Sequence, residues 1–121
     1  MSIEHKHLVV RAEIQKPLFD EEVAVNFINE LIKKINMKCM YGPVAIYCKV
    51  AGNQGMTAFA IIETSHIALH IWDESWPALL QLDVYSCSEF DPAVVFDHIK
   101  ILDPIKTDYK FLDRKTSFEE I

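Results

Sequence analysis

Residues that interrupt regular structure are scarce in this sequence, which has only 3 glycines and 5 prolines among 121 residues. Long disordered or linker segments are therefore excluded. No apolar run reaches the ~18 residues that a membrane-spanning helix needs, and residues 1–11 lack the apolar stretch and cleavage site of a secretion signal. The 3 cysteines, Cys39, Cys48 and Cys87, are odd in number and lack metal-binding spacing. These absences predict a cytoplasmic protein with reduced thiols and no membrane partner.

Positive charge is also in short supply. The chain has 12 Lys and Arg residues against 18 Asp and Glu residues, which gives a formal net charge of −6. It has no basic cluster, so a nucleic-acid partner is excluded. What the chain has in quantity is apolar side chains, which make up 50% of it. A chain of this length and composition forms one hydrophobic core, so we expect a single domain over residues 1–121.

Two hydrophobic periodicities alternate along the chain. Residues 5–14 place apolar side chains at every second position, which is typical of a strand with one buried face. Acidic residues at 20–22, followed by apolar residues three and four apart up to Ile35, indicate a helix. Asp91–Pro92 indicates the start of a second helix, which continues to Leu102. Further strands are expected at 44–50, after a break at Gly42–Pro43, and at 56–63, 66–72, 79–87 and 105–112, with a frayed tail beyond Arg114.

These elements predict an α+β fold, a two-layer sandwich of an antiparallel sheet with two helices on one face. Two helices cannot cover both faces, so the second face stays open and mixes aromatic with ionisable side chains. Such a face is typical of a ligand site or a partner interface. We therefore expect a homodimer that packs sheet to sheet in an αββα arrangement. By strand parity, the open face carries His5, His7, Arg11, Glu13, His66, His70, Trp72, Gln81, Asp83, Tyr85 and Cys87.

Metal and hydrolase chemistry are the first alternatives for these side chains. His66 and His70 have the spacing of a metal pair on a helix, but on a strand they lie roughly 13 Å apart, too far to share one ion. His5 and His7 share a face and are excluded less cleanly, although a half-exposed edge strand explains them as well. Ser65 is not in a G-x-S-x-G turn, and no glycine-rich loop precedes a helix. We expect no metal site.

Two segments taken together are more specific than any single motif. The run from Gln54 to Glu74 reads QGMTAFAIIETSHIALHIWDE, and the run from Leu82 to Cys87 reads LDVYSC, followed by Phe90-Asp91-Pro92. Their order and spacing resemble the processing-site region of the short prokaryotic S-adenosylmethionine decarboxylases. The resemblance is continuous over roughly residues 54–92. It implies a small-molecule substrate and a role in spermidine and polyamine synthesis.

The resemblance further implies a pyruvoyl enzyme that cleaves its own chain. Ser65 Oγ would attack the Thr64 carbonyl carbon and convert the amide to an ester, and His70 would then remove the α-proton of Ser65. β-Elimination releases a chain that ends at Thr64, and the dehydroalanine left at position 65 hydrolyses to a covalent pyruvoyl group. The products would be residues 1–64 and 65–121. The pyruvoyl carbonyl would bind the substrate amine as a Schiff base and store electrons when carbon dioxide leaves.

The other roles are also carried by the resemblance. Cys87 matches the acid that protonates the carbanion, and an ordinary thiol pKa near ~8.5 suits a proton donor at neutral pH. Thr57 matches a serine that assists processing in the family. Glu74 matches a glutamate in the turn that follows Trp72, where Asp73 replaces a proline. The candidate substrate-binding residues are Val50, His66 and Trp72.

The sequence departs from the family pattern at several positions. Thr64 replaces an acidic residue, Ser88 replaces a glycine, and two extra residues lie between Trp72 and Asp83. Val50 stands near the position of the aromatic residue that stacks on adenine in the family. The processing residues are thus better matched than the nucleoside pocket. Two alternatives stay open: a pyruvoyl decarboxylase of arginine or ornithine, and an unprocessed homologue that serves as a ligand-binding or regulatory module.

The processing chemistry makes a structural prediction of its own. In an unbroken strand over residues 63–72, Ser65 and His70 would point to opposite faces. The chemistry therefore requires a turn or bulge at Thr64–Ser65, which would also expose the scissile carbonyl.

Overall fold

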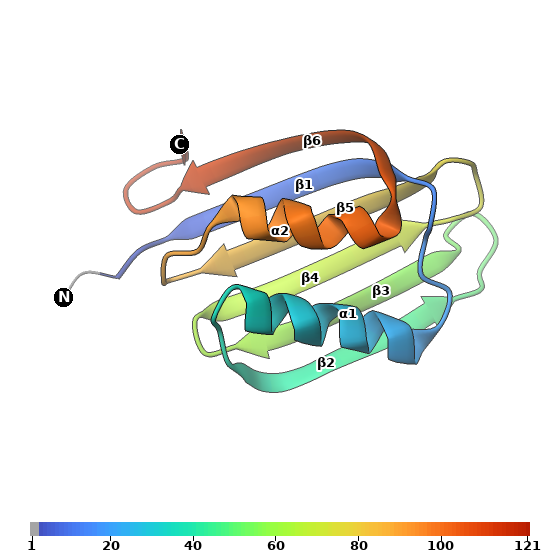
Figure 1. The fold of residues 1–121 in the computed structure, drawn as a ribbon, viewed down its shortest axis with the longest axis horizontal. Helices are drawn as coiled ribbons and strands as arrows, with labels where there is room; N and C mark the ends of the chain where they lie inside the picture. The colour runs from blue at the N-terminus through green and yellow to red at the C-terminus, as the bar shows by residue number, and fades with distance from the viewer. Residues whose placement is uncertain (1–2) are drawn as a thin grey trace.

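The computed structural model describes residues 3–121, so the first two residues of the expected domain lie outside the description. Its sheet has seven strands in the order β2-β3-β4-β5-β1-β6-β7, and each neighbouring pair is antiparallel. Both helices lie on one side of this sheet (Figure 1), which confirms the expected two-layer α+β architecture. The elements are β1 (Lys6–Ile14), α1 (Glu21–Lys34), β2 (Cys39–Cys48), β3 (Gly55–Ile62), β4 (Ser65–Trp72), β5 (Ala78–Ser86), α2 (Pro92–Ile99), the short 3₁₀ turn η1 (Lys100–Leu102), β6 (Pro104–Asp113) and β7 (Glu119–Glu120).

The core lies between the sheet and the two helices. Leu8, Val10, Ala12 and Ile14 of β1 are at most 4% exposed, as the alternation predicts. They pack with Phe27, Ile28 and Leu31 of α1 in one buried cluster. Each fully buried large aliphatic side chain contributes about 1.5–3 kcal/mol relative to an exposed one. Burial of this face fixes the strand register, and with it the side chains that point to the open face.

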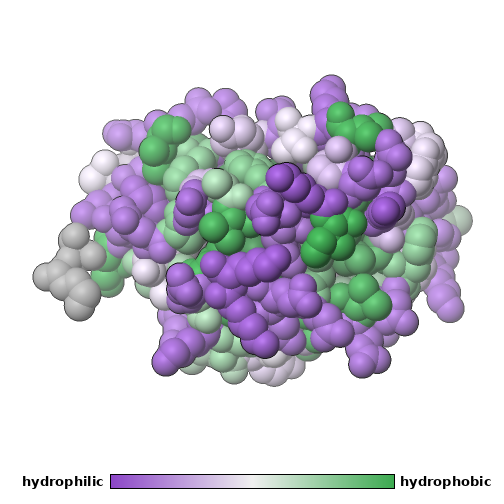
Figure 2. All heavy atoms as spheres, in the orientation of Figure 1, coloured by the Kyte–Doolittle hydropathy of each residue, from purple (hydrophilic) through white to green (hydrophobic). Residues whose placement is uncertain are grey.

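Helix α1 begins where the sequence predicts. The carboxylate of Asp20 accepts hydrogen bonds from the backbone N–H groups of Glu22 (2.8 Å) and Val23 (3.1 Å), which satisfies two donors at the helix start. Figure 2 shows the helix side of the molecule, where hydrophilic residues cover most of the surface and apolar patches are separate. In the part of the chain that the structure describes, no helix has the length and apolar character to cross a membrane.

Two expectations about element boundaries are wrong. Gly42–Pro43 does not end a strand, because β2 begins at Cys39 and shifts its register against β3 between Tyr41 and Val44. The two residues are absorbed as an irregularity within the strand. The tail beyond Arg114 is not frayed either, since Glu119–Glu120 pairs with the end of β6.

Candidate functional site

A turn interrupts the chain immediately before Ser65. Strand β3 ends at Ile62, Glu63 and Thr64 form the turn, and β4 begins with Ser65 paired to Ile62. The turn is present at Glu63–Thr64, but Ser65 itself is paired on both sides, to Ile62 and to Ser86, and the register is regular from Ser65 to Trp72. Ser65 and His70 therefore still stand at positions of opposite parity in β4, so the turn does not bring their side chains to one face. Ser65 has a φ angle of +138°, a region in which a residue other than glycine is strained by about 1–3 kcal/mol. The strain lies at the peptide bond that the proposed reaction would break.

The carbonyl oxygen of Thr64 accepts a hydrogen bond from a backbone N–H group. The N–H of Cys87, just beyond the end of β5, donates to Thr64 O at 2.7 Å. A short bond from a fixed backbone N–H polarises a carbonyl and stabilises the negative charge that forms when it is attacked. The hydroxyl of Thr64 points elsewhere and donates to Met37 Sδ at 3.0 Å. Ser65 and Cys87 are neighbours because Ser65 of β4 pairs with Ser86 of β5, the residue before Cys87.

His70 belongs to a second group of side chains further along β4. Its Nδ1 lies 3.1 Å from Thr57 Oγ1, and its ring stacks on Trp72 at 5.8 Å between centroids with an interplanar angle of 24°. The indole N–H of Trp72 donates to Asn53 Oδ1 at 2.9 Å. These four residues line a pocket of about 290 Å³. The structure thus brings Thr57 and His70, two of the predicted site residues, into contact.

The two groups lie apart within one chain. Ser65 and His70 are five residues apart on the same continuous strand, which corresponds to roughly 16 Å at ~3.3 Å per residue. An imidazole cannot reach the α-proton of Ser65 over that distance. The short spacing of Ser65 and His70 in the sequence suggests that they lie close together. The extended strand predicted for this segment already implied that they do not. Each chain therefore carries two half-sites, which we name the serine half-site (Thr64, Ser65, Cys87) and the histidine half-site (Thr57, His70, Trp72).

Glu74 binds the backbone of a neighbouring loop. Its two carboxylate oxygens accept the backbone N–H groups of Gln54 (2.9 Å) and Gly52 (3.1 Å), and these two bonds lower the pKa of the carboxyl. The adjacent Asp73 accepts from the hydroxyl of Tyr47 at 2.6 Å. The β4–β5 loop is thereby tied to the β2–β3 turn.

The candidate substrate-binding residues are dispersed. Trp72 lines the pocket of the histidine half-site, while Val50 lies after the end of β2 and is 66% exposed. The Nε2 of His66 lies 3.0 Å from Asp83 Oδ1, on the neighbouring strand. Val50 and Trp72 thus belong to one end of the sheet, and His66 lies beside the serine half-site.

The structure brings together a polar cluster that sequence reasoning did not assemble, on the open face near the serine half-site. His7 Nε2 lies 3.1 Å from Asp83 Oδ1, the same oxygen that His66 contacts. Arg114 Nη1 lies 3.0 Å from His7 Nδ1, and the guanidinium sits 4.6 Å from the centre of the Tyr85 ring. Burial would raise the pKa of Asp83, but the hydrogen bonds and charges of the two histidines outweigh it and lower that pKa. Strand parity placed His7, His66 and Asp83 on one face, and the register brings them into contact.

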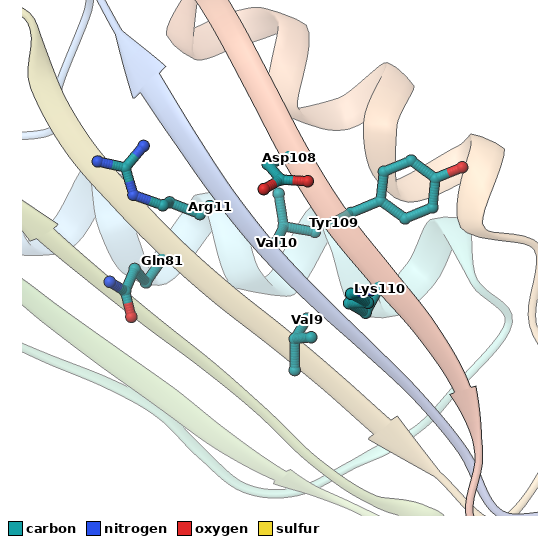
Figure 3. A pocket seen from close by; sticks show the side chains of 7 residues that line it. All are labelled: Val9, Val10, Arg11, Gln81, Asp108, Tyr109 and Lys110. Atoms are coloured by element: carbon teal, nitrogen blue, oxygen red, sulfur yellow. The ribbon is translucent and has the colours of Figure 1, made fainter. Parts of the chain in front are cut away.

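A different pocket, of about 230 Å³, lies over β5, β1 and β6. Figure 3 shows its side chains, among them Arg11 and Gln81, which are directly paired across β1 and β5. None of the residues expected in the site lines this pocket. The pocket is therefore separate from both half-sites.

Comparison with known proteins identifies the fold and then the family. A solved adenosylmethionine decarboxylase from Aquifex aeolicus has the same fold, with a TM-score of 0.69 and 22% sequence identity, over 100% of this chain and 98% of that one. A family model described as S-adenosylmethionine decarboxylase matches residues 6–115. The S-adenosylmethionine decarboxylase proenzymes of Pyrobaculum islandicum and Pyrobaculum arsenaticum are 37% and 32% identical to this chain over 99 residues. These residues cover 80% of this chain and 75% of each relative. The chain belongs to the S-adenosylmethionine decarboxylase family, a family of pyruvoyl-dependent lyases.

Proposed function

We propose that this chain cleaves itself between Thr64 and Ser65 and then decarboxylates S-adenosylmethionine in the cytoplasm, for polyamine synthesis. The family membership supports the reaction class. The observation that carries the proposal for this particular chain is the serine half-site, where a strained serine follows a carbonyl that accepts a 2.7 Å backbone hydrogen bond. An unprocessed binding module would have no need of either feature.

The cleavage begins at the strained peptide bond. Ser65 Oγ attacks the carbonyl carbon of Thr64, and the N–H of Cys87 stabilises the negative charge that forms on Thr64 O. Collapse to the ester breaks the C–N bond and relieves the unfavourable backbone angle of Ser65. Removal of the α-proton of Ser65 then expels the Thr64 carboxylate and leaves dehydroalanine at position 65. Its imine tautomer takes up water and releases ammonia, which leaves the pyruvoyl group.

The base for this last step comes from a second copy of the chain. His70 is too far from Ser65 in its own chain, so the serine half-site of one protomer must meet the histidine half-site of its partner. A sheet-to-sheet dimer with two-fold symmetry brings both pairs together at once. The open face supports such packing, because Ile46 and Phe59 expose 69% and 40% of their surface beside the histidine half-site.

The two fragments stay together after cleavage. Strand β1, from the fragment 1–64, lies between β5 and β6, which belong to the fragment 65–121. The pyruvoyl group formed at position 65 supplies an electrophilic carbonyl that captures the substrate amine and accepts electrons as carbon dioxide leaves. The thiol of Cys87, the residue after the Ser86 that pairs with Ser65, donates the proton that completes the product. No step in this scheme is assigned to a metal.

The substrate is tested by assaying release of carbon dioxide. Purified chain is incubated separately with S-adenosylmethionine, arginine and ornithine, with the Ser65→Ala variant as the blank. We expect release only from S-adenosylmethionine, and Trp72→Ala should raise the KM because Trp72 lines the pocket of the histidine half-site. Release from arginine or ornithine alone would overturn the proposed substrate and leave the self-cleavage standing.

A further inference from the structure

The cluster of His7, His66 and Asp83 has the composition of a metal site. The three residues come from the adjacent strands β4, β5 and β1, and their ligand atoms lie within 4.8 Å of one another. Two imidazoles and one carboxylate are a set that binds divalent transition ions such as Zn²⁺, Co²⁺ or Fe²⁺, with further positions open to water. Neither half-site uses His7 or Asp83.

The distances fit an ion of this kind. Metal–ligand bonds of about 2.0–2.1 Å in tetrahedral geometry place neighbouring ligand atoms about 3.3 Å apart. The Nε2 atoms of His7 and His66 lie 3.1 and 3.0 Å from Asp83 Oδ1. The side chains of His7, His66 and Asp83 are 18%, 45% and 31% exposed in the single chain. Tyr85 supports both imidazoles, with ring centroids 5.1 and 5.8 Å away.

Arg114 determines which ring nitrogen of His7 carries the proton. A guanidinium can only donate hydrogen bonds, so His7 Nδ1 accepts from Arg114, and its proton resides on Nε2, which donates to Asp83. To bind a metal, Nε2 of His7 must be unprotonated, so the proton has to lie on Nδ1. That N–H would then face the N–H donor of Arg114, and the hydrogen bond between them would be lost. The Arg114 contact therefore opposes metal binding through His7.

We propose that His7, His66 and Asp83 form a binding site for a divalent transition ion, and that Arg114 sets its affinity by competing for His7 Nδ1. An ion at this position would join β4 to β5 and β1 one residue beyond Ser65. It would thus fasten the start of β4, which becomes a chain end if residue 65 is processed. The site does not depend on that processing.

The test is titration of the metal-free full-length chain with Zn²⁺ alone, followed by calorimetry. We expect one ion per chain, and an affinity at least about tenfold weaker in His7→Gln, His66→Gln and Asp83→Asn. Arg114→Gln should tighten binding by up to about tenfold, because it removes the competing donor and offers an acceptor for Nδ1–H. Arg11→Gln, which removes the same charge from the same face outside the cluster, should leave the affinity unchanged.

Co²⁺ serves as a second probe, because its visible spectrum separates histidine and carboxylate ligands from the thiolates of Cys39, Cys48 and Cys87. A spectrum without thiolate charge transfer that disappears in Asp83→Asn is the expected result. Absence of binding, a thiolate spectrum, or equal affinity in all three ligand variants would overturn the proposal. So would Arg114→Gln binding more weakly than wild type. Thermal unfolding without metal shows that each variant is folded.

Discussion

At the scale of single residues, position 87 contributes through two different groups. Its backbone N–H donates to the Thr64 carbonyl, and its thiol is the proposed proton donor. Resemblance in the sequence identified Cys87 by its side chain, and only the structure shows the contact of its backbone. For His70, the resemblance predicted the residue type, but only the structure shows its contact with Thr57 and its separation from Ser65 along β4.

The two groups at position 87 make separable predictions. Cys87→Ala keeps the backbone N–H, so the chain should still cleave at a rate close to that of wild type. Loss of the proton donor should lower the decarboxylation rate about 10²–10⁴-fold. The measurements are intact mass over time and carbon dioxide release. Cys87→Ser is the matched control, since it restores a weaker donor and should recover part of the activity. Failure of Cys87→Ala to cleave would contradict the division of roles.

At the scale of elements, the periodicities predicted both helices and the buried strand faces. They did not predict β7 or the path of β2 through Gly42–Pro43, because both depend on pairing with strands distant in the sequence. Arg114 was missed for the same reason. It lies 107 residues from His7 in the sequence, and β6 carries it to the open face only by pairing along β1.

The contact between α1 and α2 depends on an uncharged histidine. His98 is fully buried, its Nε2 donates to Phe27 O at 2.8 Å, and Lys34 Nζ donates to its Nδ1 at 3.1 Å. Burial lowers the pKa of His98, so the unfolded chain binds its proton at a higher pH than the folded chain. The folded state is therefore favoured in full above the unfolded pKa, near ~6.5, and loses stability as the pH falls below it.

His98→Gln tests this contact, because glutamine can donate and accept but does not titrate. The free energy of unfolding is measured with urea between pH 5 and pH 7.5. Wild type should lose up to about 1.4 kcal/mol per pH unit more than the variant below the unfolded pKa. Parallel curves for the two proteins would show that His98 is protonated in the folded state as readily as in the unfolded one.

At the scale of the whole molecule, the separation of the two half-sites makes a dimer part of the proposed chemistry. One face of the sheet is buried under the helices, and the other would carry half of each of two reaction centres in the proposed dimer. The open face was predictable from strand parity, but the need for a partner's His70 was not, because it follows from a distance along β4. Under the proposed function, a chain of 121 residues is half of the unit that processes itself.

Exchange between protomers gives a direct prediction. Ser65→Ala cannot cleave, and His70→Ala should cleave poorly because its partner lacks the base. When the two variants are coexpressed in equal amounts, about half of the His70→Ala chains should pair with a Ser65→Ala partner and be cut. Mass spectrometry distinguishes the chains. Efficient cleavage of His70→Ala alone, or none in the mixture, would contradict processing between protomers.

The central claim is that the strained bond before Ser65 breaks without help from another protein. The most direct measurement is the intact mass of the purified wild-type chain, followed over time beside Ser65→Ala. The account predicts that the 14.0 kDa species gives way to two fragments, residues 1–64 and residues 65–121 with a pyruvoyl end, while Ser65→Ala stays whole. A wild-type chain that remains at 14.0 kDa after long incubation would contradict it.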